Sequence, residues 1–179
     1  MSGGTGIACP CGAVAFALEG DPILSAECHC ASCRDAAARL EARPGAPPIR
    51  EANGGTRFAL WRKDRVRCLR GRERLRAFRL TPDADTERVV ASCCRAPMYL
   101  TFAGGHWLSV YARRWPDGVG PAPELRTMTR DRPDGAALPD DIPNARRQSA
   151  SFFAKLFWAW VRMGFRNPAV VEVTEQLDA

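Results

Sequence analysis

The chain has 179 residues, of which 46% are hydrophobic and 26% are charged, and its formal net charge at pH 7 is +6. This length and composition exclude a globally disordered chain and supply enough apolar side chains for one folded domain with an appendage. The modest positive charge suits an acidic ligand or nucleic acid, but by itself it indicates neither.

No secretory signal is recognisable at the start of the chain, and we expect no transmembrane segment. The most apolar stretch, residues 151–165, is shorter than the roughly 20 residues of a membrane helix and carries Lys155 and Arg162. We therefore expect a cytoplasmic protein. Disulfides do not persist in a reducing compartment, so the eight cysteines indicate metal binding or thiol chemistry.

The first part of the chain is predicted to form strands and one short helix. Residues 14–18 alternate in side-chain size as a half-buried strand does, and residues 24–28 form a second predicted strand. Ser32, with Asp35 three residues later, resembles a helix capping box. We therefore expect a short helix over residues 34–42.

Several strand-like segments follow a Pro- and Gly-rich break at residues 43–48. They are separated by turn signals and cover residues 56–61, 65–69, 74–80, 88–92, 98–102 and 107–112. Many short strands at this spacing predict a mainly β, antiparallel domain.

The composition changes in the last third of the chain. Residues 116–148 contain so many prolines that we expect a loop or linker there, after a β domain at residues 5–115. Residues 149–179 are predicted to form an amphipathic C-terminal helix and a tail. We expect its apolar face to pack on the domain or on a second copy, as a homodimer. Docking on a membrane surface is the weaker alternative, because the helix has few charges.

Five cysteines fall into two tight groups near the N-terminus, Cys9-x-Cys11 and Cys28-x-Cys30-x-x-Cys33. Zinc takes thiolate ligands at about 2.3 Å in a tetrahedron, so its ligands have to converge from short turns. The triplet meets this need better than a lone Cys-x-x-Cys pair does. The alternative is that these are buried free thiols, which pack as small apolar side chains.

Three further cysteines lie later in the chain. Cys93 and Cys94 follow a predicted strand and are long-range partners for Cys9 and Cys11 in a zinc site. Cys68 shares the apolar face of another predicted strand and is expected to belong to the core.

The cysteine motifs resemble those of the glutathione-dependent formaldehyde-activating (GFA) family, which includes centromere-protein-V-like domains. Residues 9–16 resemble its Cys-x-Cys-Gly-x-Val-x-Phe motif, residues 28–34 its Cys-His-Cys-x-x-Cys-Arg motif, and residues 94–98 the end of its Cys-x-x-Cys-Gly-x-Pro-Leu motif. The resemblance covers about residues 7–112. It implies a β-tent of antiparallel sheets with two zinc sites, one structural, from the outer motifs, and one with an open position, from the triplet.

The chain departs from the family pattern in the last motif, so it resembles a divergent member. Ala91 stands where the family has a cysteine, Arg95 replaces its glycine, and Cys93 is new. Neighbouring residues of an extended chain point to opposite sides, so Cys93 and Cys94 bind one ion only in a kinked turn. Cys93 can complete the structural site, which we favour, or close the open position of the triplet, or one of the two sites can be lost.

The resemblance implies a carbon–sulfur lyase that acts on an adduct of glutathione, or of another small thiol, with an aldehyde, such as S-hydroxymethylglutathione. Cys28, Cys30 and Cys33 would hold the catalytic zinc. The zinc would bind the substrate thiol as a thiolate, the role we favour, or polarise the carbonyl as a Lewis acid. Arg34 and Arg95 are candidates to offset thiolate charge beside the sites.

The two histidines are not expected to be ligands. His29 lies between two candidate ligands and should point away from them. His106 follows two glycines in a predicted turn and is expected to be exposed.

A second hypothesis is a zinc-stabilised binding module without catalysis. Residues 62–79 contain nine basic side chains against Asp64 and Glu73, which suits nucleic acid or an acidic partner. Because the charges alternate with apolar residues, we favour the solvated face of a hairpin. A third hypothesis, redox chemistry at Cys93 and Cys94, ranks last, since a disulfide between neighbouring residues is strained.

Overall fold

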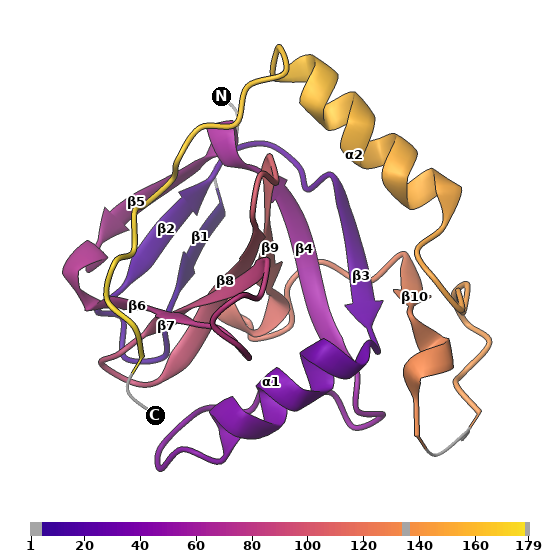
Figure 1. Ribbon diagram of the computed structural model, residues 1–179, viewed down its shortest axis with the longest axis horizontal. Helices are drawn as coiled ribbons and strands as arrows, with labels where there is room; N and C mark the ends of the chain where they lie inside the picture. Colours follow the sequence, from indigo (N-terminus) through magenta and orange to yellow (C-terminus); the bar gives the residue numbers. More distant parts are fainter. Residues whose placement is uncertain (1–4, 134–136, 178–179) are drawn as a thin grey trace.

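The computed structural model describes residues 5–133 and 137–177 and shows a mainly β fold with a C-terminal helix (Figure 1). The smaller sheet has the order β1–β2–β5, with β1 at Thr5–Ala8, β2 at Ala15–Leu18 and β5 at Val66–Arg70. The larger sheet has the order β10–β3–β4–β9–β8–β7–β6. Its strands are β3 (Leu24–Cys28), β4 (Thr56–Arg62), β6 (Leu75–Phe78), β7 (Thr86–Ala91), β8 (Ala96–Phe102), β9 (Trp107–Tyr111) and β10 (Leu125–Thr127).

Neighbouring strands are antiparallel except β10 and β3, which run parallel. The sequence predicts these strands apart from β1 and β10. β10 is a three-residue strand within the Pro-rich segment, and it exists because it pairs with the edge of β3, where Thr127 lies opposite Cys28. Short 3-10 turns lie at Lys63–Arg65, Arg72–Arg74, Ala112–Arg114 and Thr129–Asp131.

The larger sheet is buried on both faces. In β4, Ala59 and Trp61 pack in the core shared with the smaller sheet, whereas Phe58 and Leu60 pack in the core shared with the helices. This division follows from the two-residue period of a strand. The cores on the two sides of the sheet explain why β4 is almost continuously apolar in sequence.

Helix α1 (Ala31–Glu41) begins earlier than predicted. Its N-cap is Cys30, whose Sγ accepts a hydrogen bond from the Cys33 backbone N–H at 3.3 Å. The prediction of a capping box at Ser32 was wrong, because a cysteine sulfur takes the role that serine usually has at this position. Ser32 instead accepts a hydrogen bond from Arg88, which belongs to β7.

Helix α2 (Ala150–Arg162) is the predicted C-terminal helix, with Ser149 as its N-cap. Only a narrow stripe of it, Leu156 and Ala159, is buried. Phe153, Phe157 and Trp158 of the predicted apolar segment are 57%, 52% and 61% exposed. The helix therefore contacts the domain along one edge and leaves several aromatic side chains in solvent.

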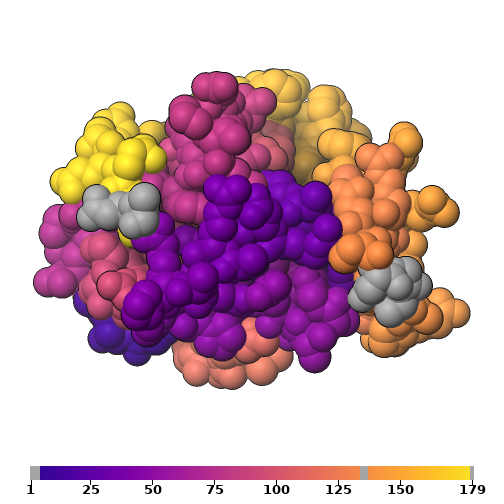
Figure 2. Space-filling model, turned by 60° about the horizontal axis from the view of Figure 1, so that its bottom comes forward, coloured from indigo at the N-terminus to yellow at the C-terminus, as the bar shows by residue number. Residues whose placement is uncertain are grey.

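The tail after α2 returns to the sheets. The Ala77 N–H in β6 donates to the Glu175 carbonyl oxygen, and the Leu177 N–H donates to the Ala77 carbonyl oxygen, both at 2.8 Å. In Figure 2 this tail (yellow) lies at the opposite end of the molecule from the orange segment that contains β10. Across residues 5–133 and 137–177, none of the helices combines the length and the apolar character that crossing a bilayer requires.

Candidate metal centres and the adjacent cavity

The first cysteine cluster joins two distant turns. Cys9 and Cys11 lie in the turn between β1 and β2, and Cys93 and Cys94 lie in the turn between β7 and β8. The four Sγ atoms all lie within 4.8 Å of one another. The structure thus places Cys93 in this cluster and not with the triplet.

The spacing of these sulfurs fits a tetrahedral zinc ion. Four thiolates at about 2.3 Å from one ion would lie about 3.8 Å apart. Cys9 Sγ lies 3.5 Å from Cys11 Sγ and 3.8 Å from Cys93 Sγ, and Cys11 Sγ lies 3.3 Å from Cys93 Sγ. Cys93 and Cys94, although adjacent in sequence, have their sulfurs 4.0 Å apart. All four cysteines are free, so the cluster can hold a metal ion.

A kinked turn at residues 92–95 brings both neighbouring cysteines to the same side. Arg95 ends this turn with φ at 57°, in the left-handed region. Glycine adopts this conformation without strain, and the resemblance places a glycine at this position. The turn therefore keeps the expected backbone shape although its residue differs.

The second cluster contains the predicted triplet. Cys28 ends β3, Cys30 caps α1, and Cys33 lies in the first turn of that helix, and their sulfurs lie within 4.8 Å of one another. Within the described residues, no fourth cysteine, histidine or carboxylate joins them. The donor set suits zinc, and three thiolates leave one of four tetrahedral positions open.

Hydrogen bonds within the triplet concentrate negative charge on Cys30. The pKa of Cys30 is lowered to about 3, first because the Cys28 thiol donates to its thiolate and then because the Cys33 thiol does so. The first of these hydrogen bonds also raises the pKa of Cys28 to about 12. The positive end of α1 further favours a thiolate at its N-cap. Cys30 is therefore already a thiolate when a metal cation binds.

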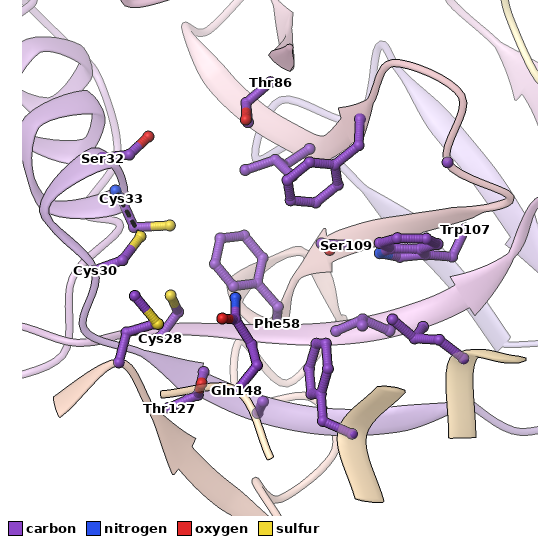
Figure 3. A pocket seen from close by; sticks show the side chains of 18 of the residues that line it. Cys28, Cys30, Ser32, Cys33, Phe58, Thr86, Trp107, Ser109, Thr127 and Gln148 are labelled. Carbon is purple, nitrogen blue, oxygen red and sulfur yellow. Dashed lines mark hydrogen bonds between the residues drawn. The ribbon is translucent and has the colours of Figure 1, made fainter. Parts of the chain in front are cut away.

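A cavity of about 560 Å³ opens beside the triplet. It lies between the helix-facing side of the larger sheet, the start of α1, and α2. Figure 3 shows the three cysteines gathered at one end of it and Trp107 at the other end of the view, with Phe58 between them. Ser32, Thr86, Ser109, Thr127 and Gln148 add polar groups.

Arg88 is a residue of this cavity that was not among the predicted site residues. Its side chain lines the cavity, yet the residue is only 1% exposed. Nη2 donates to Ser32, whereas Nε and Nη1 have no hydrogen-bond partner, and no carboxylate among the described residues pairs with the guanidinium. Its charge also contributes to the lowered pKa of Cys30. The sequence feature that could have identified Arg88 is a charged residue on the core-facing side of a predicted strand.

Arg114 has the corresponding place at the first cluster. It is 3% exposed, and its Nε and Nη1 also have no hydrogen-bond partner. Burial lowers its pKa, and the negative charges of Cys94 and Cys9 oppose that effect. Four thiolates around a divalent ion would leave a net charge of −2, which this buried cation would partly offset.

The two arginines that we proposed to offset thiolate charge, Arg34 and Arg95, donate to backbone carbonyl oxygens. Arg34 donates to the backbone carbonyl oxygens of His29 and Asp131, and Arg95 donates to that of Pro44. The described contacts of both guanidinium groups therefore stabilise loops, and the structure brings neither of them to a sulfur atom.

The histidines lie outside both clusters. His29 is fully buried, and its Nε2 lies 2.8 Å from Glu27 Oε1, so it points away from the triplet as expected. The prediction that His106 is exposed was wrong. It is 8% exposed, its Nε2–H donates to the Leu156 carbonyl oxygen at 2.8 Å, and its ring stacks on Trp160, because α2 packs over the turn that carries it.

Five of the nine basic side chains of residues 62–79 form ion pairs. Ion pairs join Arg62 to Asp64, Arg65 to Glu19, Arg74 to Glu73, Arg76 to Glu175, and Arg79 to Glu87. These pairs reduce the positive potential that a nucleic-acid surface needs. Cys68 packs against the core at its edge and lies outside both cysteine clusters.

One segment of the chain matches a known protein family. Residues 5–44 match the family described as glutathione-dependent formaldehyde-activating enzyme. This segment contains the first two cysteine motifs and α1, and the match confirms the resemblance that these motifs indicate. No curated protein matches the chain.

Proposed function

We propose that this divergent member of the GFA family is a carbon–sulfur lyase that acts on the adduct of a small thiol, such as glutathione, with an aldehyde. In this proposal Cys9, Cys11, Cys93 and Cys94 hold a structural zinc ion, and Cys28, Cys30 and Cys33 hold a catalytic one. The observation that carries the proposal is the convergence of three cysteines, and not four, at one end of a cavity.

The two clusters suit different tasks. Four thiolates complete a tetrahedron, so the first cluster would tie the β1–β2 turn to the β7–β8 turn without reacting. When bound at the triplet, zinc would supply an open position that holds a substrate sulfur as a thiolate. A reducing compartment, such as the cytoplasm, would keep all of these ligands free.

The reaction needs a group that holds the oxygen of the adduct. As the C–S bond breaks, the sulfur keeps the bonding electron pair, the hydroxyl proton passes to water, and the C–O bond becomes a carbonyl. Arg88 lines the cavity, two of its nitrogen atoms have no hydrogen-bond partner, and Ser32 holds its guanidinium in place. A buried donor aimed at that oxygen would stabilise the charge that develops on it.

The test is an exchange measurement by nuclear magnetic resonance. Purified protein is added to glutathione and formaldehyde at equilibrium with S-hydroxymethylglutathione, and the exchange rate is compared for wild type, Cys30→Ser and Cys68→Ser. We expect wild type and Cys68→Ser to accelerate exchange and Cys30→Ser to lose the effect together with one metal ion. Unchanged exchange with Cys30→Ser would rule out this site as the catalytic one.

A further inference from the structure

We propose, building on the lyase function above, that the aldehyde part of the adduct is a bulky apolar group, aromatic or branched, and not the single carbon of formaldehyde. The inference rests on the composition and the size of the cavity beside the triplet.

The walls of the cavity are apolar over most of their extent. Five of the lining residues are aromatic, namely Phe58, Phe102, Trp107, Phe152 and Phe153. Among the described residues that line the cavity, Arg88 is the only one with a permanently charged side chain. These aromatic rings are suited to contact another apolar or aromatic group.

A charged thiol does not fit this interior. Glutathione has two carboxylates and one ammonium group, and burying unpaired charges in an apolar cavity is costly. One buried guanidinium cannot pair with all three. The charged part of such a thiol must therefore extend out of the cavity, and its sulfur alone reaches the triplet. The interior remains for the group on the other side of the sulfur, which is the aldehyde.

The volume is far larger than formaldehyde requires. A one-carbon group occupies about the space of one or two water molecules, on the order of 50 Å³. The cavity measures about 560 Å³. A cavity of roughly 150 Å³ already accommodates a benzene ring. Without a ligand, water would fill this space and lie against the apolar walls, which is unfavourable. A ligand that displaces the water and covers the walls therefore gains binding free energy.

Arg88 fixes the direction in which such a group would lie. Its Nη2 donates to Ser32, which lies between Cys30 and Cys33 in the first turn of α1, so the guanidinium would receive the oxygen of the adduct at this end of the cavity. The side chain on the carbonyl carbon would then point along the aromatic walls toward Trp107 (Figure 3).

Helix α2 offers a matched pair of variants. Phe153 lines the cavity and Phe157 does not, although both lie on the same helix and are 57% and 52% exposed. Replacing either one with serine therefore removes the same side chain at a similar cost to the fold. Only Phe153→Ser changes the wall of the cavity.

The first measurement compares the kcat/KM for glutathione adducts of phenylacetaldehyde and formaldehyde. One methylene in a fitted pocket changes kcat/KM by about 10-fold or more, so we expect at least about 10-fold preference for phenylacetaldehyde. Phe153→Ser should reduce this preference several-fold, whereas Phe157→Ser should keep it. An equal or greater kcat/KM for formaldehyde would overturn the inference and leave the lyase function standing.

The second measurement is independent of turnover. 2-Phenylethanethiol reproduces the sulfur, two carbons and ring of the phenylacetaldehyde adduct, and 2-mercaptoethanol lacks the ring. By calorimetry on the zinc-loaded protein we expect at least about 10-fold tighter binding of the aromatic thiol, weakened in Phe153→Ser only. Selective binding without turnover of any adduct would support the apolar site and reject the lyase. Equal affinity for both thiols would reject the apolar site.

Discussion

Arg88 and Ser32 are joined by two hydrogen bonds at the end of the cavity where the three cysteines lie. Nη2 of Arg88 donates to the Ser32 hydroxyl oxygen at 3.0 Å and to its carbonyl oxygen at 3.2 Å. Ser32 is in the first turn of α1, between Cys30 and Cys33. These hydrogen bonds hold Arg88 of β7 against the N-terminal end of α1, where the three cysteines lie. Helix α1 begins at Ala31, 57 positions before Arg88 in the chain.

Replacing Arg88 with methionine should lower activity without lowering the stability of the fold. We expect kcat/KM to fall about 100-fold, the typical effect of losing one donor to a developing oxyanion, while the metal content stays unchanged. Stability should stay the same or rise, since an unpaired buried cation is removed. Steady-state kinetics and thermal unfolding measure the two effects.

The control for Arg88 is Arg34→Met. Arg34 donates to the backbone carbonyl oxygens of His29 and Asp131, so its loss should lower stability with little effect on kcat/KM. Full activity of Arg88→Met would show that this guanidinium does not contact the reacting atoms.

Cys93→Ser should remove one metal ion and leave the other. Its sulfur lies within 4.8 Å of those of Cys9, Cys11 and Cys94, so the first cluster would keep only three thiolates. Elemental analysis of the purified protein should show two zinc ions in wild type, one in Cys93→Ser and two in Cys68→Ser. Two ions in Cys93→Ser would mean that Cys93 is not a ligand.

Arg95→Gly should be more stable than Arg95→Ala. Both variants lose the contact with Pro44, so their difference isolates the strain at φ 57°. A residue with a Cβ in the left-handed region costs roughly 1–2 kcal/mol, and the greater freedom of glycine in the unfolded chain offsets part of it. We expect Arg95→Gly to exceed Arg95→Ala by about 0.5–1 kcal/mol in the free energy of unfolding, measured by urea denaturation with metal bound. Equal stability would argue against strain in this turn.

His106 should make stability depend on pH. Burial lowers its pKa, and the charge of Lys63 acts in the same direction, whereas the hydrogen bond to Leu156 opposes them. The folded state therefore disfavours protonation of His106. Its contribution to the free energy of unfolding is fully present above its pKa in the unfolded chain, about 6.5. That contribution is lost as the pH falls from this value through the lower pKa of His106 in the folded state.

The control for this pH dependence is His106→Gln, which retains a donor for the Leu156 carbonyl oxygen but does not titrate. Protonation of cysteine ligands affects both proteins equally, so only the difference between their unfolding free energies matters. That difference should narrow or change sign between pH 7 and pH 5. A constant difference would contradict a lowered pKa of His106 in the folded protein.

Local pattern in the chain was enough to predict most of the fold. Alternating side chains identified the strands from β2 to β9, because burial of alternate residues follows directly from the pleat of a strand. The spacing of Cys28, Cys30 and Cys33 pointed to a metal site for a similar reason: three donors within six residues can converge through a single turn. The match of residues 5–44 to the family rests on such local motifs as well.

Contacts between distant segments could not be predicted in this way. Cys93 joins Cys9 because the β7–β8 turn bends, and an extended chain would have separated it from Cys94. Arg88 and His106 are buried by helices from other parts of the chain, and nothing in their sequence neighbourhoods indicates those partners. Burial, charge compensation and the shape of the cavity depend on which surfaces meet, and that is settled by packing of the whole domain and not by the order of residues along one strand.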